Sequence, residues 1–220
     1  MLSTPITKDI DYDKVYEPSE DSFYLLDCFE QERDYLETKF KKNKVPIITE
    51  IGTGSGILTT FLLQHILKDG IYIATDVNPN ACKSVLQTVR NNCPTQAHLV
   101  DSSQMDLTSA IRSNIIDTLI FNPPYVPASE VPDIPVTDED SKWLDLALLG
   151  GEDGMIVTWK VLNNLERILS TDGVAYILFC ARNNPDKVAN EMTDRGWKVD
   201  VVISKKAGWE VLTILRFSRL

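Results

Sequence analysis

The sequence predicts an α/β fold, a doubly wound sheet of about seven strands with helices on both faces. Short apolar runs rich in β-branched residues alternate with longer segments of helical periodicity, which is typical of parallel strands joined by crossover helices. The last two strand-like runs have only a short connection between them, so they predict a hairpin and one antiparallel strand near an edge of the sheet. We expect residues 1–220 to form a single domain, because this length suits one hydrophobic core.

The first half of the chain supplies four of these strands. Residues 19–40 predict a helix that Ser19 caps and that carries Glu20 and Asp21 in its first turn, where the helix dipole favours acidic side chains. The following segments are, in order, a strand at 45–51, a helix at 57–70 that ends at a glycine, a strand at 71–76, a helix at 78–92 with a proline in its first turn, and strands at 96–101 and 115–122.

The second half begins with an irregular stretch, residues 126–149, that is rich in proline and acidic side chains. It is too long for a simple connection, so it predicts either a loop that faces a substrate or a solvated surface loop. The later segments are, in order, a helix at 155–169, a strand at 174–180, a helix at 185–195 that a glycine stops, and strands at 197–204 and 210–218.

Composition argues against several functions. The net charge of −10 disfavours direct binding of nucleic acid, since phosphate contacts draw on clustered Lys and Arg. The four cysteines form no CxxC pair and the two histidines do not flank them at ligand spacing, so we expect no metal site. No apolar run approaches the roughly 18 residues of a membrane span, and the N-terminal residues lack the apolar core of a signal peptide. We therefore expect a cytoplasmic or nuclear protein that does not bind membranes.

Ligands of such sheets bind at the carboxyl ends of the strands, so the segments that follow the first four strands are informative. The first is EIGTGSG, residues 50–56, whose glycines let the backbone turn tightly and approach a ligand closely. Gly52, Gly54 and Gly56 have the spacing GxGxG and not the GxGxxG of dinucleotide-binding proteins, which disfavours a dinucleotide oxidoreductase. Taken alone, such a turn also suits a purely structural role.

Acidic residues follow the second and third predicted strands. Asp76 lies at an offset from the glycine loop at which its carboxylate would accept two hydrogen bonds from a ribose diol, although it would also suit the cap of the next helix. Asp101 and Ser102 follow the third predicted strand, where they would hold an adenine amino group, but acids end many strands. The combination with the glycine loop favours a nucleoside site.

The fourth predicted strand is followed by NPPY, Asn122 to Tyr125. The two prolines remove two backbone donors and stiffen the turn, which leaves carbonyl acceptors beside an asparagine side chain and a tyrosine ring. Such a turn suits a planar NH2 group, because two acceptors would take its two protons while the ring stacks on it.

In this order the motifs resemble those of class I S-adenosylmethionine-dependent methyltransferases, whose Rossmann-like sheet has an antiparallel C-terminal strand. The NPPY form is typical of enzymes that methylate amide or exocyclic-amine nitrogens. YEPSEDSF (16–23), ALLGGEDG (147–154) and NNP (183–185) narrow the resemblance to the HemK-like protein-glutamine N5-methyltransferases. It is strongest with the short eukaryotic branch that modifies the GGQ motif of the class I translation release factor, and it extends from about residue 15 to the C-terminus.

The resemblance implies roles for individual residues. Asn122, Pro123 and Tyr125 would be catalytic and would bind the substrate glutamine together with Pro124. The residues expected to bind the cofactor S-adenosyl-L-methionine are Ser22, Glu50, Gly52, Gly54, Asp76, Asp101, Ser102 and Asn122. Residues 1–45 would form the N-terminal helix and a segment that covers the cofactor. Within YEPSEDSF the acidic residues are expected to be structural, and Ser22 is expected to contact the methionine end.

Members of the short branch work with a small zinc-binding activator protein, so the resemblance also implies a heterodimer. The third strand is a plausible docking strip for it at an edge of the sheet. The chain departs from its relatives in two places. The stretch before Glu50 is too short for the N-terminal helical domain of the bacterial members, and residues 143–145 read Trp-Leu-Asp where many relatives have an acid-Pro pair.

Three alternatives share the same motifs. A DNA or RNA adenine-N6 methyltransferase would use the NPPY site for an exocyclic amine, but it is disfavoured by the acidic charge and by YEPSEDSF. A protein-lysine methyltransferase would use the same site for an ammonium group. A non-catalytic scaffold would keep the fold without transfer, but the intact glycine loop and NPPY turn argue against it.

Overall fold

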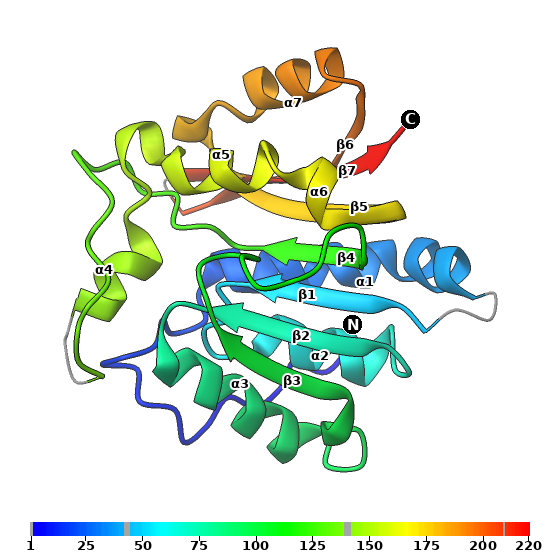
Figure 1. Ribbon diagram of the computed structural model, residues 1–220, viewed down its shortest axis with the longest axis vertical. Coiled ribbons are helices and arrows are strands. Elements are labelled where there is room, and N and C mark those ends of the chain that lie inside the picture. Colours follow the sequence, from blue (N-terminus) through cyan, green and yellow to red (C-terminus); the bar gives the residue numbers. More distant parts are fainter. Residues whose placement is uncertain (1, 42–44, 139–141, 209) are drawn as a thin grey trace.

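The computed structural model describes residues 2–41, 45–138, 142–208 and 210–220. Within these residues, seven strands form one mixed sheet in the order β3-β2-β1-β4-β5-β7-β6, which confirms the predicted α/β fold (Figure 1). Strand β7 runs antiparallel to both β5 and β6, whereas the other pairs of neighbouring strands are parallel, as the predicted hairpin requires. The strands are β1 Ile47–Ile51, β2 Ile71–Asp76, β3 Val100–Gln104, β4 Ile116–Phe121, β5 Leu169–Cys180, β6 Trp197–Ala207 and β7 Glu210–Arg219.

The helices form two layers, one on each face of the sheet (Figure 1). One layer contains α1 Glu20–Phe40, α2 Ile57–His65 and α3 Pro79–Asn92, and the other contains α5 Ile156–Leu162, α6 Leu165–Ile168 and α7 Pro185–Asp194. The short helix α4 Lys142–Leu148 lies within the stretch that the sequence predicts to be irregular. Three single 3-10 turns complete the described elements: η1 Ala97–Leu99, η2 Glu152–Gly154 and η3 Ala181–Asn183.

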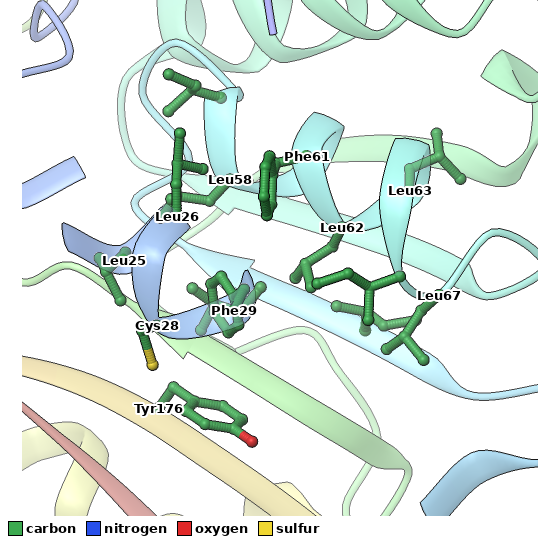
Figure 2. Close-up of a cluster of buried hydrophobic side chains, with 14 of the residues drawn as sticks. Leu25, Leu26, Cys28, Phe29, Leu58, Phe61, Leu62, Leu63, Leu67 and Tyr176 are labelled. Carbon is green, nitrogen blue, oxygen red and sulfur yellow. The ribbon is translucent and has the colours of Figure 1, made fainter. Parts of the chain in front are cut away.

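Alternation along the strands divides the apolar side chains between two cores. In β5, Tyr176 packs among the residues of α1 and α2, whereas Ile177 packs in the core under α5, α6 and α7. Figure 2 shows the first core, in which Phe29 of α1 lies beside Tyr176 and Leu62 of α2 belongs to the same cluster. The rings of Phe29 and Tyr176 meet edge to face, with 5.3 Å between their centroids. This packing fixes α1 on the sheet, and with it the YEPSEDSF segment at the start of the helix.

The third strand begins later than predicted. Residues 97–99 form a 3-10 turn, and β3 runs from Val100 to Gln104, so the predicted strand at 96–101 is wrong in its bounds. β3 is an edge strand with mostly polar, partly exposed residues, and the short apolar run marks only its beginning. The residues that directly follow the strand are therefore Met105 and Asp106, whereas Asp101 and Ser102 lie within it.

Two predicted helices are also too long. The helix expected at 155–169 is divided into α5 and α6 at Asn163 and Asn164, because asparagine favours a helix interior poorly and the backbone of Asn164 leaves the helical region. The helix expected at 57–70 ends at His65. None of the described helices combines the length and apolarity that crossing a membrane would require.

The arrangement places two predicted motifs side by side. β1 and β4 are neighbours at the centre of the sheet, and the chain leaves them toward opposite edges, to β2 and to β5. Ligand-binding crevices form at this kind of switch point in doubly wound sheets. The glycine loop follows β1 and the NPPY turn follows β4, so the two motifs meet at the same point.

Candidate active site

A cavity of about 640 Å³ opens at the carboxyl ends of β1, β2, β3 and β4. This volume is in the range of sites for small molecules. Its wall combines the first turn of α1, the glycine loop, the ends of β2 and β3, the NPPY turn and part of residues 126–149. The predicted site residues that line it are Ser22, Glu50, Gly52, Gly54, Asp76, Asn122, Pro123, Pro124 and Tyr125.

The glycine loop joins the ends of β1 and β2 under the cavity. Gly52 and Gly54 have φ angles of 66° and 49°, in the left-handed region that side chains disfavour. The N–H of Gly52 donates to the carbonyl of Thr75 (2.8 Å), and that of Gly54 donates to the Asp76 carboxylate (3.1 Å). Gly52 and Gly54 therefore present backbone to a ligand in the cavity.

Glu50 is the penultimate residue of β1, and its carboxylate is buried. Its Oε2 accepts hydrogen bonds from the Thr59 N–H (3.1 Å), the Thr59 hydroxyl and the Thr53 hydroxyl (3.2 Å). Burial raises the pKa of Glu50 to about 7, although the bonds from Thr59 oppose this shift. A cationic group in the cavity would favour the charged form of this carboxylate.

Asp76 ends β2 on the other side of the loop. Its Oδ2 accepts from Gly54, and its Oδ1 accepts from the N–H of Asn78 (2.8 Å). Burial raises its pKa to about 6. The cap of α3 is Asn78, whose side chain accepts from the N–H of Asn80 (2.9 Å), so helix capping does not account for Asp76.

Asp101 and Ser102 do not line the cavity. Asp101 is exposed and accepts from the N–H of Ser102 (2.8 Å), and the Ser102 hydroxyl donates to the carbonyl of Cys82 (2.8 Å). Because β3 ends later than predicted, the cavity is lined instead by residues 105–107, Met-Asp-Leu. In the sequence, Asp106 is the residue that could have indicated this part of the cavity. No apolar run marks the end of β3, however, so the sequence does not show that Asp106 follows the strand.

The NPPY turn presents an acceptor to the cavity. The Nδ2 of Asn122 donates to Oδ2 of Asp21 (3.0 Å). Its Oδ1 is buried and has no hydrogen-bond partner among the described residues. A buried acceptor without a partner costs free energy. This atom is therefore suited to a donor that a ligand brings.

Asp21 is the centre of a hydrogen-bond cluster and is only 4% exposed. It also accepts from the hydroxyls of Tyr16 (3.3 Å) and Tyr125 (3.4 Å) and from the N–H of Ser22 (2.7 Å). Burial and the charge of Asp21 raise the pKa of Tyr16 to about 12 and that of Tyr125 further, so both hydroxyls stay neutral donors. Asp21 thus faces the site, which the helix-dipole interpretation missed. Ser19 holds the cap position without making a side-chain capping bond, contrary to the prediction.

Two other motifs contact the backbone carbonyls of the NPPY turn. A Cβ on Gly150 would lie 2.2 Å from the carbonyl oxygen of Pro124, and a Cβ on Gly154 would lie 2.0 Å from that of Tyr125. The Nδ2 of Asn183 donates to the same Tyr125 carbonyl (3.1 Å) and to a carbonyl of η2 (2.8 Å). ALLGGEDG and NNP therefore determine where the NPPY turn lies.

Residues 126–149 cover one side of the cavity, although 139–141 lie outside the described residues. A bridge pairs Val126 with Leu149 and closes the stretch at its base. The carboxylate of Asp138 meets the ammonium of Lys83 on α3 (3.2 Å). The residues of the stretch that line the cavity are Val126, Val131, Pro132, Asp133, Ile134, Trp143, Leu146, Ala147 and Leu148.

This arrangement provides two carboxylates and a glycine loop for a nucleoside-like ligand, beside an acceptor for an N–H donor. Among the described residues, no group of His, Cys, Asp and Glu could hold a metal ion. The chemistry that fits the site is the positioning of a nitrogen next to a bound nucleoside-containing cofactor.

Comparison with known proteins shows the family to which the chain is similar. Residues 28–136 match the family model described as the methyltransferase small domain. The chain is 38% identical to the eRF1 methyltransferase catalytic subunit mtq2 of Schizosaccharomyces pombe, over 100% of this chain and 97% of the relative. It is 32% identical to the methyltransferase HEMK2 of Homo sapiens, over 94% of this chain and 91% of the relative.

A solved structure has a similar fold. The E. cuniculi structure described as an Mtq2-Trm112 complex responsible for the methylation of the eRF1 translation termination factor aligns with a TM-score of 0.66 and 24% identity. The alignment covers 94% of this chain and 99% of that one. At this level of identity, the similarity shows the shared fold.

Proposed function

Because the chain belongs to the methyltransferase small domain family, we propose that it transfers a methyl group from S-adenosyl-L-methionine to a glutamine side-chain nitrogen. The substrate is the glutamine of the GGQ motif in eRF1, the eukaryotic class I release factor. The fission-yeast relative, which aligns over this whole chain, is named for methylation of that protein. The enzyme would then act in translation termination and be found in the cytoplasm, and also in the nucleus.

The observation that carries this proposal is the buried, unpaired Oδ1 of Asn122 at the end of β4. An amide nitrogen is a poor nucleophile because its lone pair is delocalised. Oδ1 of Asn122 and the carbonyl of Pro123 accept the two protons of the substrate amide, which fixes its orientation and favours electron density on nitrogen. The ring of Tyr125 stacks on the amide plane and keeps water from it.

The remaining cavity residues suit the cofactor. Glu50 and Gly52 hold the methionine end, where the carboxylate meets the ammonium group, and Asp76 accepts from the ribose hydroxyls. Residues 105–107 take the adenine role that the sequence suggested for Asp101 and Ser102. When bound, the cofactor supplies a methyl group that its sulfonium already activates. The protein therefore contributes mainly positioning, and the proton can leave the nitrogen after transfer.

The catalytic subunit works as a heterodimer with a small zinc-binding activator of the Trm112 kind. The E. cuniculi structure of similar fold is described as such a complex. Strand β3 suits the docking strip, because it forms an edge of the sheet and carries exposed polar side chains. A chain that is stable and fully active when it is expressed without any activator would contradict this part of the proposal.

Residues 126–149 face the protein substrate. They line the cavity beside the NPPY turn, and their acidic side chains suit a basic surface. The stretch is therefore the contact for the part of eRF1 that surrounds the GGQ loop.

Mass spectrometry tests the proposal directly. eRF1 is incubated with the chain, the activator and the cofactor, and a parallel reaction contains the Asn122→Ala variant. We expect the mass of one methyl group on the GGQ glutamine in the first reaction only. Methylation of a lysine, or of adenine in oligonucleotides offered alongside, would replace the proposal by one of its alternatives. No methyl transfer to any of these acceptors would refute it.

A further inference from the structure

Among the described residues, every group that donates a hydrogen bond to the buried carboxylate of Asp21 belongs to a residue that lines the cavity. Asp21 lies in the first turn of α1, far in sequence from the NPPY turn, yet its Oδ2 is 3.0 Å from Nδ2 of Asn122. The hydroxyls of Tyr16 and Tyr125 also donate to Oδ2 of this carboxylate. The N–H and the hydroxyl of Ser22 donate to its Oδ1 as well, and five donors around one carboxylate are more than helix capping requires, so the cluster calls for another explanation.

The cluster matters because an asparagine side chain has two different faces. Its amide presents a donor, Nδ2, and an acceptor, Oδ1, in nearly the same shape, so a half-turn about the last bond exchanges them. A carboxylate only accepts hydrogen bonds. Asp21 therefore stabilises the rotamer in which Nδ2 of Asn122 points toward α1 and Oδ1 points away from it.

We propose that Asp21 is a positioning residue that fixes the amide of Asn122, so that Oδ1 and not Nδ2 meets the incoming amide of the substrate. This inference rests on the proposed function and assigns a role to a residue outside the NPPY turn. Without Asp21 the flipped amide directs its N–H2 at the N–H2 of the substrate, and two donors repel each other. Transfer would then require the less populated rotamer.

The first test replaces the carboxylate by its isosteric amide. Asp21→Asn keeps the volume of the side chain but can satisfy Asn122 in either orientation, so we expect kcat to fall by about 10², the typical cost of misplacing a reacting group. The dissociation constant of the cofactor should change by less than about threefold, because the contacts of Glu50 and Asp76 remain. The matched control is Glu20→Gln, which removes the same charge from the exposed neighbour on α1 and should leave kcat unchanged. Equal kcat values for the Asp21 variant and the wild type would overturn the proposal.

A double variant separates positioning from a merely structural role. Asn122→Asp alone places two carboxylates face to face and should lose activity. In Asp21→Asn/Asn122→Asp the donor and the acceptor have changed places, so the amide at position 21 donates to the carboxylate at position 122, whose second oxygen again accepts from the substrate. We expect kcat to recover at least about tenfold over either single variant, because donor and acceptor again alternate. A double variant no better than the single variants would contradict the orientation argument.

A spectroscopic measurement keeps this inference separate from the proposed function. The side-chain N–H2 of Asn122 is assigned by NMR from the signal that Asn122→Asp removes. In the wild type these protons should exchange slowly with water, and in Asp21→Asn their exchange should accelerate by about tenfold or more. If no substrate is methylated but exchange changes in this way, the proposed function fails and the positioning role stands. If exchange is the same in both proteins, the positioning role fails.

Discussion

The two halves of the cavity offer a ligand different physical interactions. The half at the ends of β1 and β2 contains two carboxylates, buried Glu50 and half-buried Asp76, whose pKa values are raised to about 7 and about 6. The half at the end of β4 contains a turn of fixed shape, in which Asn122 and the backbone offer neutral acceptors. Asp21 holds this turn from one side and ALLGGEDG and NNP hold it from the other.

The difference suits two different tasks. A cofactor that carries charged groups is bound well by carboxylates, and this binding changes with pH. A neutral amide offers no charge to attract, so its reactivity depends on the positions of its partners. Substitutions in the first half should therefore change affinity, and substitutions in the second half should change the rate of transfer.

Asn122→Ala should have the largest effect. It removes the acceptor that the substrate amide needs, and loss of one such hydrogen bond in a preorganised site lowers kcat by about 10²–10³. Calorimetry should show that cofactor affinity persists, since the carboxylate half is unchanged. Loss of cofactor affinity in this variant would show that the two halves are not separate and would overturn the assigned role of Asn122.

Gly154→Ala tests the support behind the turn without touching the cavity. Its φ of 67° disfavours a side chain, and the new Cβ would lie 2.0 Å from the carbonyl oxygen of Tyr125, so the turn must shift. We expect kcat to fall by about 10-fold to 10²-fold, the scale for misplaced reacting groups, with nearly unchanged cofactor affinity.

The matched control for this variant is Gly196→Ala. That glycine also has a positive φ, 88°, but no atom lies within 4 Å of the added Cβ. Both variants should lose about 1–3 kcal/mol of unfolding free energy from backbone strain. Only the Gly154 variant should lose activity, and equal kcat values in the two variants would refute the supporting role of ALLGGEDG.

The sequence predicted the site residues at the end of β4 better than those at the end of β3, for physical reasons. β4 is central and wholly buried, so its apolar run ends where NPPY begins and the site residues follow directly. β3 lies at an edge and is polar, so its end leaves no mark in the hydrophobic pattern, and Asp101 was chosen where Asp106 lines the cavity. Asp21 was missed because its position also suits the helix dipole, and only the fold brings it to Asn122.

The pH dependence of binding should distinguish the halves. Glu50 has a raised pKa of about 7, so it is increasingly protonated below pH 7 and loses its attraction for an ammonium group. Between pH 8 and pH 6 we expect cofactor affinity to fall about tenfold in titration calorimetry, and Glu50→Gln should flatten this dependence. The stability of the cofactor-free protein should change in the opposite sense. Folded Glu50 and Asp76 bind protons more tightly than they do when unfolded, so the free energy of unfolding rises as pH falls from 7 to 5.

The smallest expected effect concerns the end of β3 and compares two exposed acids. Asp106→Asn should weaken cofactor binding about fivefold, the scale of one hydrogen bond, because Asp106 lines the cavity. Asp101→Asn makes the same chemical change five positions earlier on the same edge, outside the cavity, and should leave the affinity unchanged. Both variants remove one negative charge, so a general electrostatic effect would lower the two affinities equally. If only the Asp101 variant binds the cofactor more weakly, then Asp101 makes the adenine contact that the sequence alone suggested. In that case β3 would end earlier when the cofactor is bound.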